Sequence, residues 1–249
     1  RHGGVGDDFV AYWSVGRIID ENGFSQIYES DKMRDIYTHE IKEQGYIIDI
    51  DTNTNVVGYL PVFVWPFQLL SRVDLPYSFW IWNIINSVIL FGYLVFFLKS
   101  TESGIEASTR DMVLLTLVFI SYPVIKNLTS GNVNVFLLIC TGEFIRNAVN
   151  NKPFLSGIWL GGLLLKPVLL ILIIPIFLIR RNWDVLKGFF VSSGTILLVS
   201  VFLAGFTGMK SLINLWTKYS SGSFSGTAPG LMINWRMIGF TLDDQFNLS

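Results

Sequence analysis

The sequence has 249 residues, of which 51% are hydrophobic and 15% aromatic, and its mean hydropathy is +0.49. This composition is too apolar for a soluble domain of that length and predicts an all-α polytopic membrane protein. The net charge of −1 without a basic block argues against a nucleic-acid partner, and the single cysteine, Cys140, allows no internal disulfide.

Residues 1–73 are polar enough to lie in water, yet their apolar residues recur at helical spacing. This pattern predicts amphipathic helices lying along a surface. Capping residues and composition place a first helix at 7–22, a second at 30–44, a short strand at 46–51 and a proline-containing interfacial or re-entrant helix at 58–70. We expect residues 1–73 to form an extracytoplasmic loop.

Residues 74–206 contain the apolar runs that predict membrane helices. The expected segments are a span to about residue 98, a short span at 112–125 with its return at 133–145, a hairpin at 153–179 and a last span at 185–206. The turn between 125 and 133 is expected on the outer side and holds Lys126, Asn127, Asn132 and Asn134. Residues 207–249 are expected to form a second outer segment.

The hairpin follows from the basic residues on both of its flanks. Arg146 and Lys152 precede the apolar run, Arg180 and Arg181 follow it, and short basic loops prefer the cytoplasm. Each leg then has about 13 residues, or roughly 20 Å, which is short of the roughly 30 Å hydrocarbon core. The break at Lys166 therefore lies below the outer headgroups, where an ammonium needs a counter-charge or a wet cavity, and a lipid-linked phosphate would serve.

Two other interpretations of Lys166 stay open. Its side chain could snorkel from a loop, or the run could be one proline-kinked span. The ends of the chain carry a further expectation: it starts with Arg1 rather than Met, although the topology starts it outside the membrane. We therefore expect a fragment that lacks at least the first span, with residues 207–249 also truncated.

An acidic pair, Asp7-Asp8, stands at the start of the first predicted helix. A carboxylate there could take a proton from a sugar hydroxyl, or the pair could simply cap the helix and align with its dipole. Lys126, Lys166 and Arg236 are cations on predicted outer segments that could neutralise a phosphate leaving group.

Asn132 and Asn134 could donate hydrogen bonds to sugar hydroxyls, or Gly131-Asn132 could be ordinary helix capping. Asp49 and Asp51 match a short acid-x-acid metal pattern, but their spacing only places both on one face of a strand. With only two histidines in the chain, no metal site and no cofactor are expected.

Six stretches in order, DDFVAYW, GFSQIYES, GYLPVFVWP, SGNVNVFLL, GIWLGGLLLKP and MINWRMIGF, resemble the signature of glycosyltransferase family 87. The resemblance implies a C-type membrane glycosyltransferase bundle that uses a polyprenyl-phosphate sugar, with mannose the usual sugar. By position it implies that Asp8 is the general base, within the family's Asp-Phe-x-x-Tyr pattern that also contains Tyr12. Asn132 stands where the family often has Gln, and Ile233 where Pro is usual.

The resemblance also places Lys166 in the family's Lys-Pro pair, and Asn234 with Arg236 in its Asn-x-Arg motif. The sequence thus predicts an inverting glycosyltransferase of the cell membrane with an extracytoplasmic site. Its expected partners are a polyprenyl-phosphate sugar, a lipid or glycan acceptor and membrane lipids. The predicted substrate-binding residues are Asp7, Tyr12, Lys126, Asn132, Asn134, Lys166, Asn234 and Arg236. A lipid or glycan transporter, which would not need Asp8, is the alternative.

Overall fold

The computed structural model describes residues 6–36, 39, 57–101 and 107–220, and every element within them is helical. The predicted strand at 46–51 and the predicted site residues Asn234 and Arg236 lie outside the described residues. Two helices, Leu75–Ser100 and Trp183–Lys218, are long and apolar enough to cross a membrane, and a bent helix pair can be counted as a third span. The prediction of an all-helical membrane protein is therefore confirmed for the described part of the chain.

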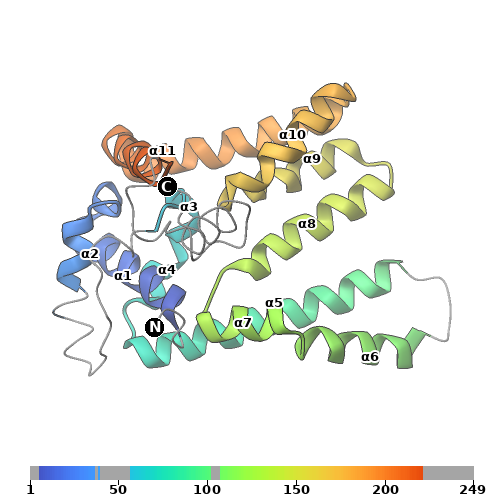
Figure 1. Cartoon of the computed structure of the whole chain (residues 1–249), viewed down its shortest axis with the longest axis horizontal. Helices are drawn as coiled ribbons and strands as arrows, with labels where there is room; N and C mark the ends of the chain where they lie inside the picture. Colours follow the sequence, from blue (N-terminus) through green and yellow to red (C-terminus); the bar gives the residue numbers. More distant parts are fainter. Residues whose placement is uncertain (1–5, 37–38, 40–56, 102–106, 221–249) are drawn as a thin grey trace, which may run out of the picture.

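The apolar helices run roughly along the long axis of the molecule (Figure 1). They are α5 (Leu75–Thr101), α6 (Ala107–Phe119), α7 (Tyr122–Ser130), α8 (Asn134–Val149), α9 (Pro153–Gly161), α10 (Leu170–Ile179) and α11 (Trp183–Ser220). The short connections after α8 and α10, which carry Lys152, Arg180 and Arg181, lie at one end, here called the basic end. The N-terminal helices gather at the other, here called the α1 end.

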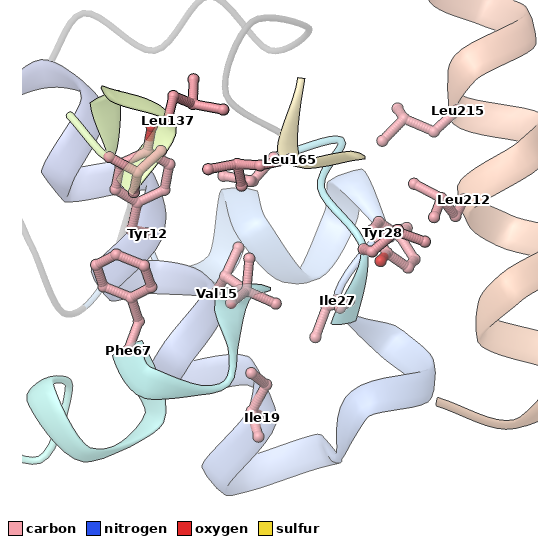
Figure 2. Close-up of a cluster of buried hydrophobic side chains, with 14 of the residues drawn as sticks. Tyr12, Val15, Ile19, Ile27, Tyr28, Phe67, Leu137, Leu165, Leu212 and Leu215 are labelled. Carbon is pink, nitrogen blue, oxygen red and sulfur yellow. The ribbon is translucent and has the colours of Figure 1, made fainter. Parts of the chain in front are cut away.

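The α1 end is built around α1 (Asp7–Asn22), which packs against α2 (Ser30–Ile36), α3 (Pro61–Val64) and α4 (Pro66–Leu70). The predicted C-cap is confirmed, because Gly23 has a φ of 84° and its N–H donates to Ile19 O at 3.1 Å. The helix does not lie along a surface, however. Phe9, Trp13 and Ile18 are buried, and Figure 2 shows other α1 side chains among residues of α4, α8 and α11.

The contact between α1 and α4 is close and polar at its rim. A Cβ on Gly16 would come within 2.2 Å of Phe67 O, so this position admits only glycine without movement of α4. At the exposed edge Asp20 accepts hydrogen bonds from the Arg72 guanidinium at 2.8 and 2.9 Å and from Gln68 at 2.9 Å. These bonds lower the pKa of Asp20 to about 2, so the Asp20 carboxylate stays charged and bonded to Arg72 at neutral pH.

The segment predicted as a short span followed by an outer turn is a broken helix. α6 and α7 meet at an angle of 49°, at residues 120–121, and Pro123 restarts the helix in its first turn. Lys126 and Asn127, expected in the turn, therefore lie on α7, and the turn is confined to residues 131–133. Gly131 ends α7 in the left-handed conformation, with a φ of 70°.

The chain reverses direction between α9 and α10 (Figure 1), and Lys166 separates the two legs. The first leg is α9 followed by the 3₁₀ turn η3 (Gly162–Leu165), and the second is the 3₁₀ turn η4 (Pro167–Leu169) followed by α10. Gly162 sets the position of the tip against α8, because a Cβ there would lie 2.4 Å from Cys140 Sγ. Cys140 is thus a packing residue of the bundle.

Two glycines bring α9 and α11 into backbone contact. A Cβ on Gly157 would lie 2.0 Å from Val185 O, and a Cβ on Gly188 would lie 2.0 Å from Phe154 O. The two helices therefore approach through small residues, as helices do in membranes where lipid leaves no hydrophobic driving force for association.

We expect Gly188→Ala to destabilise the protein by about 1–3 kcal/mol, because the new methyl group would push α9 off α11. Gly194→Ala is the matched control on the same helix, since a Cβ at Gly194 meets nothing within 4 Å. The control should be neutral or slightly stabilising, as alanine is the better helix former. Thermal unfolding in detergent, followed by circular dichroism, measures both. Equal midpoints for the two variants would contradict the close crossing.

The helix α11 extends beyond the predicted end of the last span at residue 206. Its helical path is broken at Gly205, which has φ 64° and ψ 179°, and it then continues to Ser220. The part after Gly205 packs on the α1 end, where Trp216 Nε1 donates to Gly58 O at 2.8 Å and Gly208 approaches Ser25 and Phe24. The first residues of the predicted outer segment 207–249 are therefore helical.

Candidate functional site

The Asp8 side chain is directed across the fold and does not cap its own helix. The N-cap of α1 is Gly6, in the left-handed conformation, and no side chain caps the helix. Asp8 is half-buried and its Oδ2 accepts a hydrogen bond from Asn132 Nδ2 at 2.7 Å. The partner lies 124 residues further along the chain, so the carboxylate is held at a junction of two distant segments.

The turn that carries Asn132 is fixed to α1 and α5. Trp82 Nε1 donates to Gly131 O at 2.9 Å, and Gly6 N donates to Thr129 O at 2.7 Å. A Cβ on Gly131 would lie 2.6 Å from Phe9 Cβ, so the turn packs directly against α1. Asn132 Oδ1 accepts the N–H of Val133 at 2.8 Å, which orients its amide so that Nδ2 faces Asp8.

Lys166 bonds to the residue that directly follows this turn. Its Nζ donates to Asn134 Oδ1 at 2.7 Å, and the backbone N–H of Asn134 donates to Asn127 Oδ1 at 3.2 Å. The ammonium is thus held by a neutral amide at the first residue of α8. A kink in one continuous span does not describe this arrangement, because the two legs reverse direction.

The carboxylate of Asp8 and the ammonium of Lys166 are held on neighbouring asparagines, with only Val133 between them in the chain. The two charges interact electrostatically, and within the described part of the chain each is hydrogen-bonded to its own asparagine. An acid–base pair held apart in this way keeps a proton acceptor and a cation available to a ligand at the same time.

Tyr12 lies one helical turn after Asp8, and its hydroxyl is 3.3 Å from the hydroxyl of Tyr59. Burial raises the pKa of both phenols, and the negative charge of Asp8 adds to this effect. Both side chains therefore remain neutral hydroxyls beside the carboxylate. Tyr59 was not predicted because nothing in its local pattern distinguishes it from the apolar residues around it.

Lys126 and Asp7, also predicted as site residues, have no described contact with Asp8 or Lys166. Lys126 is exposed on α7, and none of the described contacts links its side chain to Asp8, Asn132, Asn134 or Lys166. The side chain of Asp7 is not among those described. Within the described ranges, no group of three His, Cys, Asp or Glu residues could hold a metal ion.

The model of glycosyltransferase family 87 matches residues 58–237, which is more than half of the sequence. The chain belongs to glycosyltransferase family 87. It is therefore a membrane glycosyltransferase, and the resemblance seen in its motifs is confirmed. The match contains Asn132, Asn134 and Lys166, whereas α1 with Asp8 precedes it. Neither the search of curated proteins nor that of solved structures returned a match.

Proposed function

We propose that this family 87 glycosyltransferase transfers a sugar, with mannose the first candidate, from a polyprenyl-phosphate donor to a lipid or glycan acceptor on the extracytoplasmic side. The reaction inverts the anomeric centre. An acceptor hydroxyl attacks the anomeric carbon while its proton passes to Asp8. The bond between that carbon and the phosphate oxygen breaks, and the polyprenyl phosphate leaves with the electron pair. No metal or cofactor takes part.

The side chains of the site have separate roles in this proposal. Asp8 is the base, and Lys166 stabilises the charge that develops on the phosphate. Asn132 orients Asp8 through the 2.7 Å hydrogen bond, and Asn134 orients Lys166 in the same way. Tyr12 contacts the acceptor side of the site, with Asp7 as a further orienting carboxylate. Lys126, Asn234 and Arg236 remain candidates for the phosphate or the sugar.

One observation carries the proposal: the Asp8 carboxylate and the Lys166 ammonium are held by asparagines on the two sides of residue 133. Helix capping would not direct Asp8 across the fold, and a lysine kept only for packing would gain nothing at membrane depth. A base and a cation on the two sides of one turn match what an attacking hydroxyl and a departing phosphate require.

The direct test is transfer by the purified protein in detergent or nanodiscs. Polyprenyl-phosphate mannose, labelled in the sugar, is supplied with a lipid extract as acceptor, and polyprenyl-phosphate glucose and a nucleotide sugar serve as comparison donors. We expect labelled product and free polyprenyl phosphate from the first donor. Label transferred only from the nucleotide sugar would contradict the proposed donor class.

The proposed side of the site gives a separate prediction. Cysteines introduced at Asn151 and Asn182, both exposed at the basic end, should react in intact cells only with a membrane-permeant thiol reagent. A cysteine at Glu21, exposed on α1, should also react with an impermeant one. Background from Cys140 should be small because this thiol is only 1% exposed. Labelling of Asn151 and Asn182 from opposite sides would contradict the topology.

A further inference from the structure

A second polar region of the α1 end takes no part in the site described above. It is a cavity of about 290 Å³ between the start of α2 and the part of α11 after Gly205. Its lining is mainly polar and includes Glu29, Ser30, Asp31, Ser211 and Asn214. We infer that this cavity binds a sugar unit of the acceptor, away from the hydroxyl that reacts. The inference rests on the proposed function and assigns the acceptor to the carbohydrates.

The size and chemistry of the cavity fit a hydroxyl-rich ligand. Its volume is at the lower end of the range of small-molecule sites, which suits about one sugar ring. Carboxylates accept hydrogen bonds from hydroxyls, serine hydroxyls both donate and accept, and the Asn214 amide does both through two atoms. Tyr28 and Leu215 also border the cavity, but both are buried, so a ligand would meet mainly the polar side chains.

The charges of the lining distinguish this ligand from the donor. The cavity carries the two carboxylates of Glu29 and Asp31 against the single ammonium of Lys218. Two carboxylates would repel the phosphate of a polyprenyl-phosphate sugar, and they favour a neutral polyhydroxyl group. The acceptor's sugar, and not the donor's phosphate, is therefore the expected occupant.

Both walls of the cavity are held in place before any ligand binds. Tyr28 is buried, its hydroxyl donates to Tyr59 O at 2.6 Å, and it lies beside Leu212 and Leu215 of α11 (Figure 2). The hydrogen bond from Trp216 Nε1 to Gly58 O fixes α11 next to Tyr59, the residue to which Tyr28 bonds. A site with rigid walls binds with less loss of conformational entropy than a mobile one.

The same contacts connect the cavity with the candidate catalytic site. Tyr28 bonds to the backbone of Tyr59, the Tyr59 hydroxyl meets Tyr12, and Tyr12 lies one turn from Asp8. An acceptor sugar in the cavity would thus be held by the framework that carries the base. Binding of a remote part of a substrate in this manner can be used to position the reacting part.

The test uses the whole protein and the double variant Ser211→Ala, Asn214→Ala, which removes polar groups from a helix face without adding bulk. The matched control is Asn150→Ala, an exposed asparagine at the basic end. We expect the double variant to raise the KM for the acceptor at least tenfold while kcat and the KM for polyprenyl-phosphate mannose stay within twofold of the parent. Lipid-linked and free oligosaccharide acceptors are assayed side by side, and the source with the larger rise is the one recognised.

A binding measurement separates this inference from the proposed function. Saturation-transfer NMR with free disaccharides of mannose, glucose and galactose needs no transfer reaction. Signal on the parent and the Asn150→Ala control that disappears in the double variant supports the cavity, even if polyprenyl-phosphate mannose proves not to be the donor. An unchanged acceptor KM, or disaccharide signal equal in parent and double variant, or no signal on the parent, overturns the inference.

Discussion

Replacing Asp8 with asparagine is expected to lower the rate of sugar transfer about 10²- to 10⁴-fold, the usual contribution of a general base. Asparagine keeps the shape of the side chain, and its amide oxygen can still accept the 2.7 Å hydrogen bond from Asn132. It cannot take a proton from the acceptor. The folded structure and the affinity for the donor should therefore change little, while kcat falls.

Purified Asp8→Asn is compared with the parent by transfer assay, donor titration and thermal unfolding. Asp7→Asn should cost less if Asp7 only orients its neighbour or the acceptor. Asp184→Asn is a control of the same chemistry at the basic end, where Asp184 forms an exposed ion pair with Lys187. A folded Asp8→Asn protein that binds donor and transfers at the parental rate would remove Asp8 from the mechanism.

Replacing Lys166 with methionine is the second large effect that we expect. Loss of one group that stabilises developing charge costs about 10²- to 10³-fold in rate, and the KM for the polyprenyl-phosphate donor should rise as well. The substitution also leaves Asn134 Oδ1 without its 2.7 Å donor, for which we expect about 1–3 kcal/mol of destabilisation. The protein should therefore remain folded but be measurably less stable.

Lys166→Arg tests whether charge alone is sufficient. Its planar guanidinium replaces a compact ammonium, so we expect only partial recovery of the rate and of the donor KM. Lys210→Met, on the exposed face of α11, is the matched control and should behave as the parent. Donor kinetics of Lys166→Met that equal those of the control would show that the lysine has only a packing role.

The parts of the fold that sequence predicts well are those set by local chemistry. The Asn22-Gly23 end of α1 and the break at Lys166-Pro167 depend on residues that restrict their own backbone. The predicted end of the last span at residue 206 falls at the break at Gly205, whereas the continuation of α11 to Ser220 was not predicted. The helix α7 was missed since Asn127 and Lys126 lowered its apparent apolarity.

For the candidate site, the sequence singled out individual residues but did not predict how they pair. Asp8, Asn132, Asn134 and Lys166 stood out because polar groups near membrane segments are costly and need a reason. That Asn132 would face Asp8 and Asn134 would face Lys166 depends on packing between segments that are 124 and 32 residues apart. No pattern of neighbouring residues contains that information.

The distance along the chain between Asp8 and Asn132 constrains how the protein is made. Ribosomes deliver α1 long before α8, so the carboxylate has no partner until 124 further residues have been synthesised and their helices inserted. The ring contact of Phe9 with Phe67 and the hydrogen bond from Trp13 Nε1 to Val73 O need only the first 73 residues, so they can form well before Asn132 is made. The packing of α1 against α4 can therefore form early in synthesis, whereas the hydrogen bond that orients Asp8 forms only after the turn at residues 131–133 has been made.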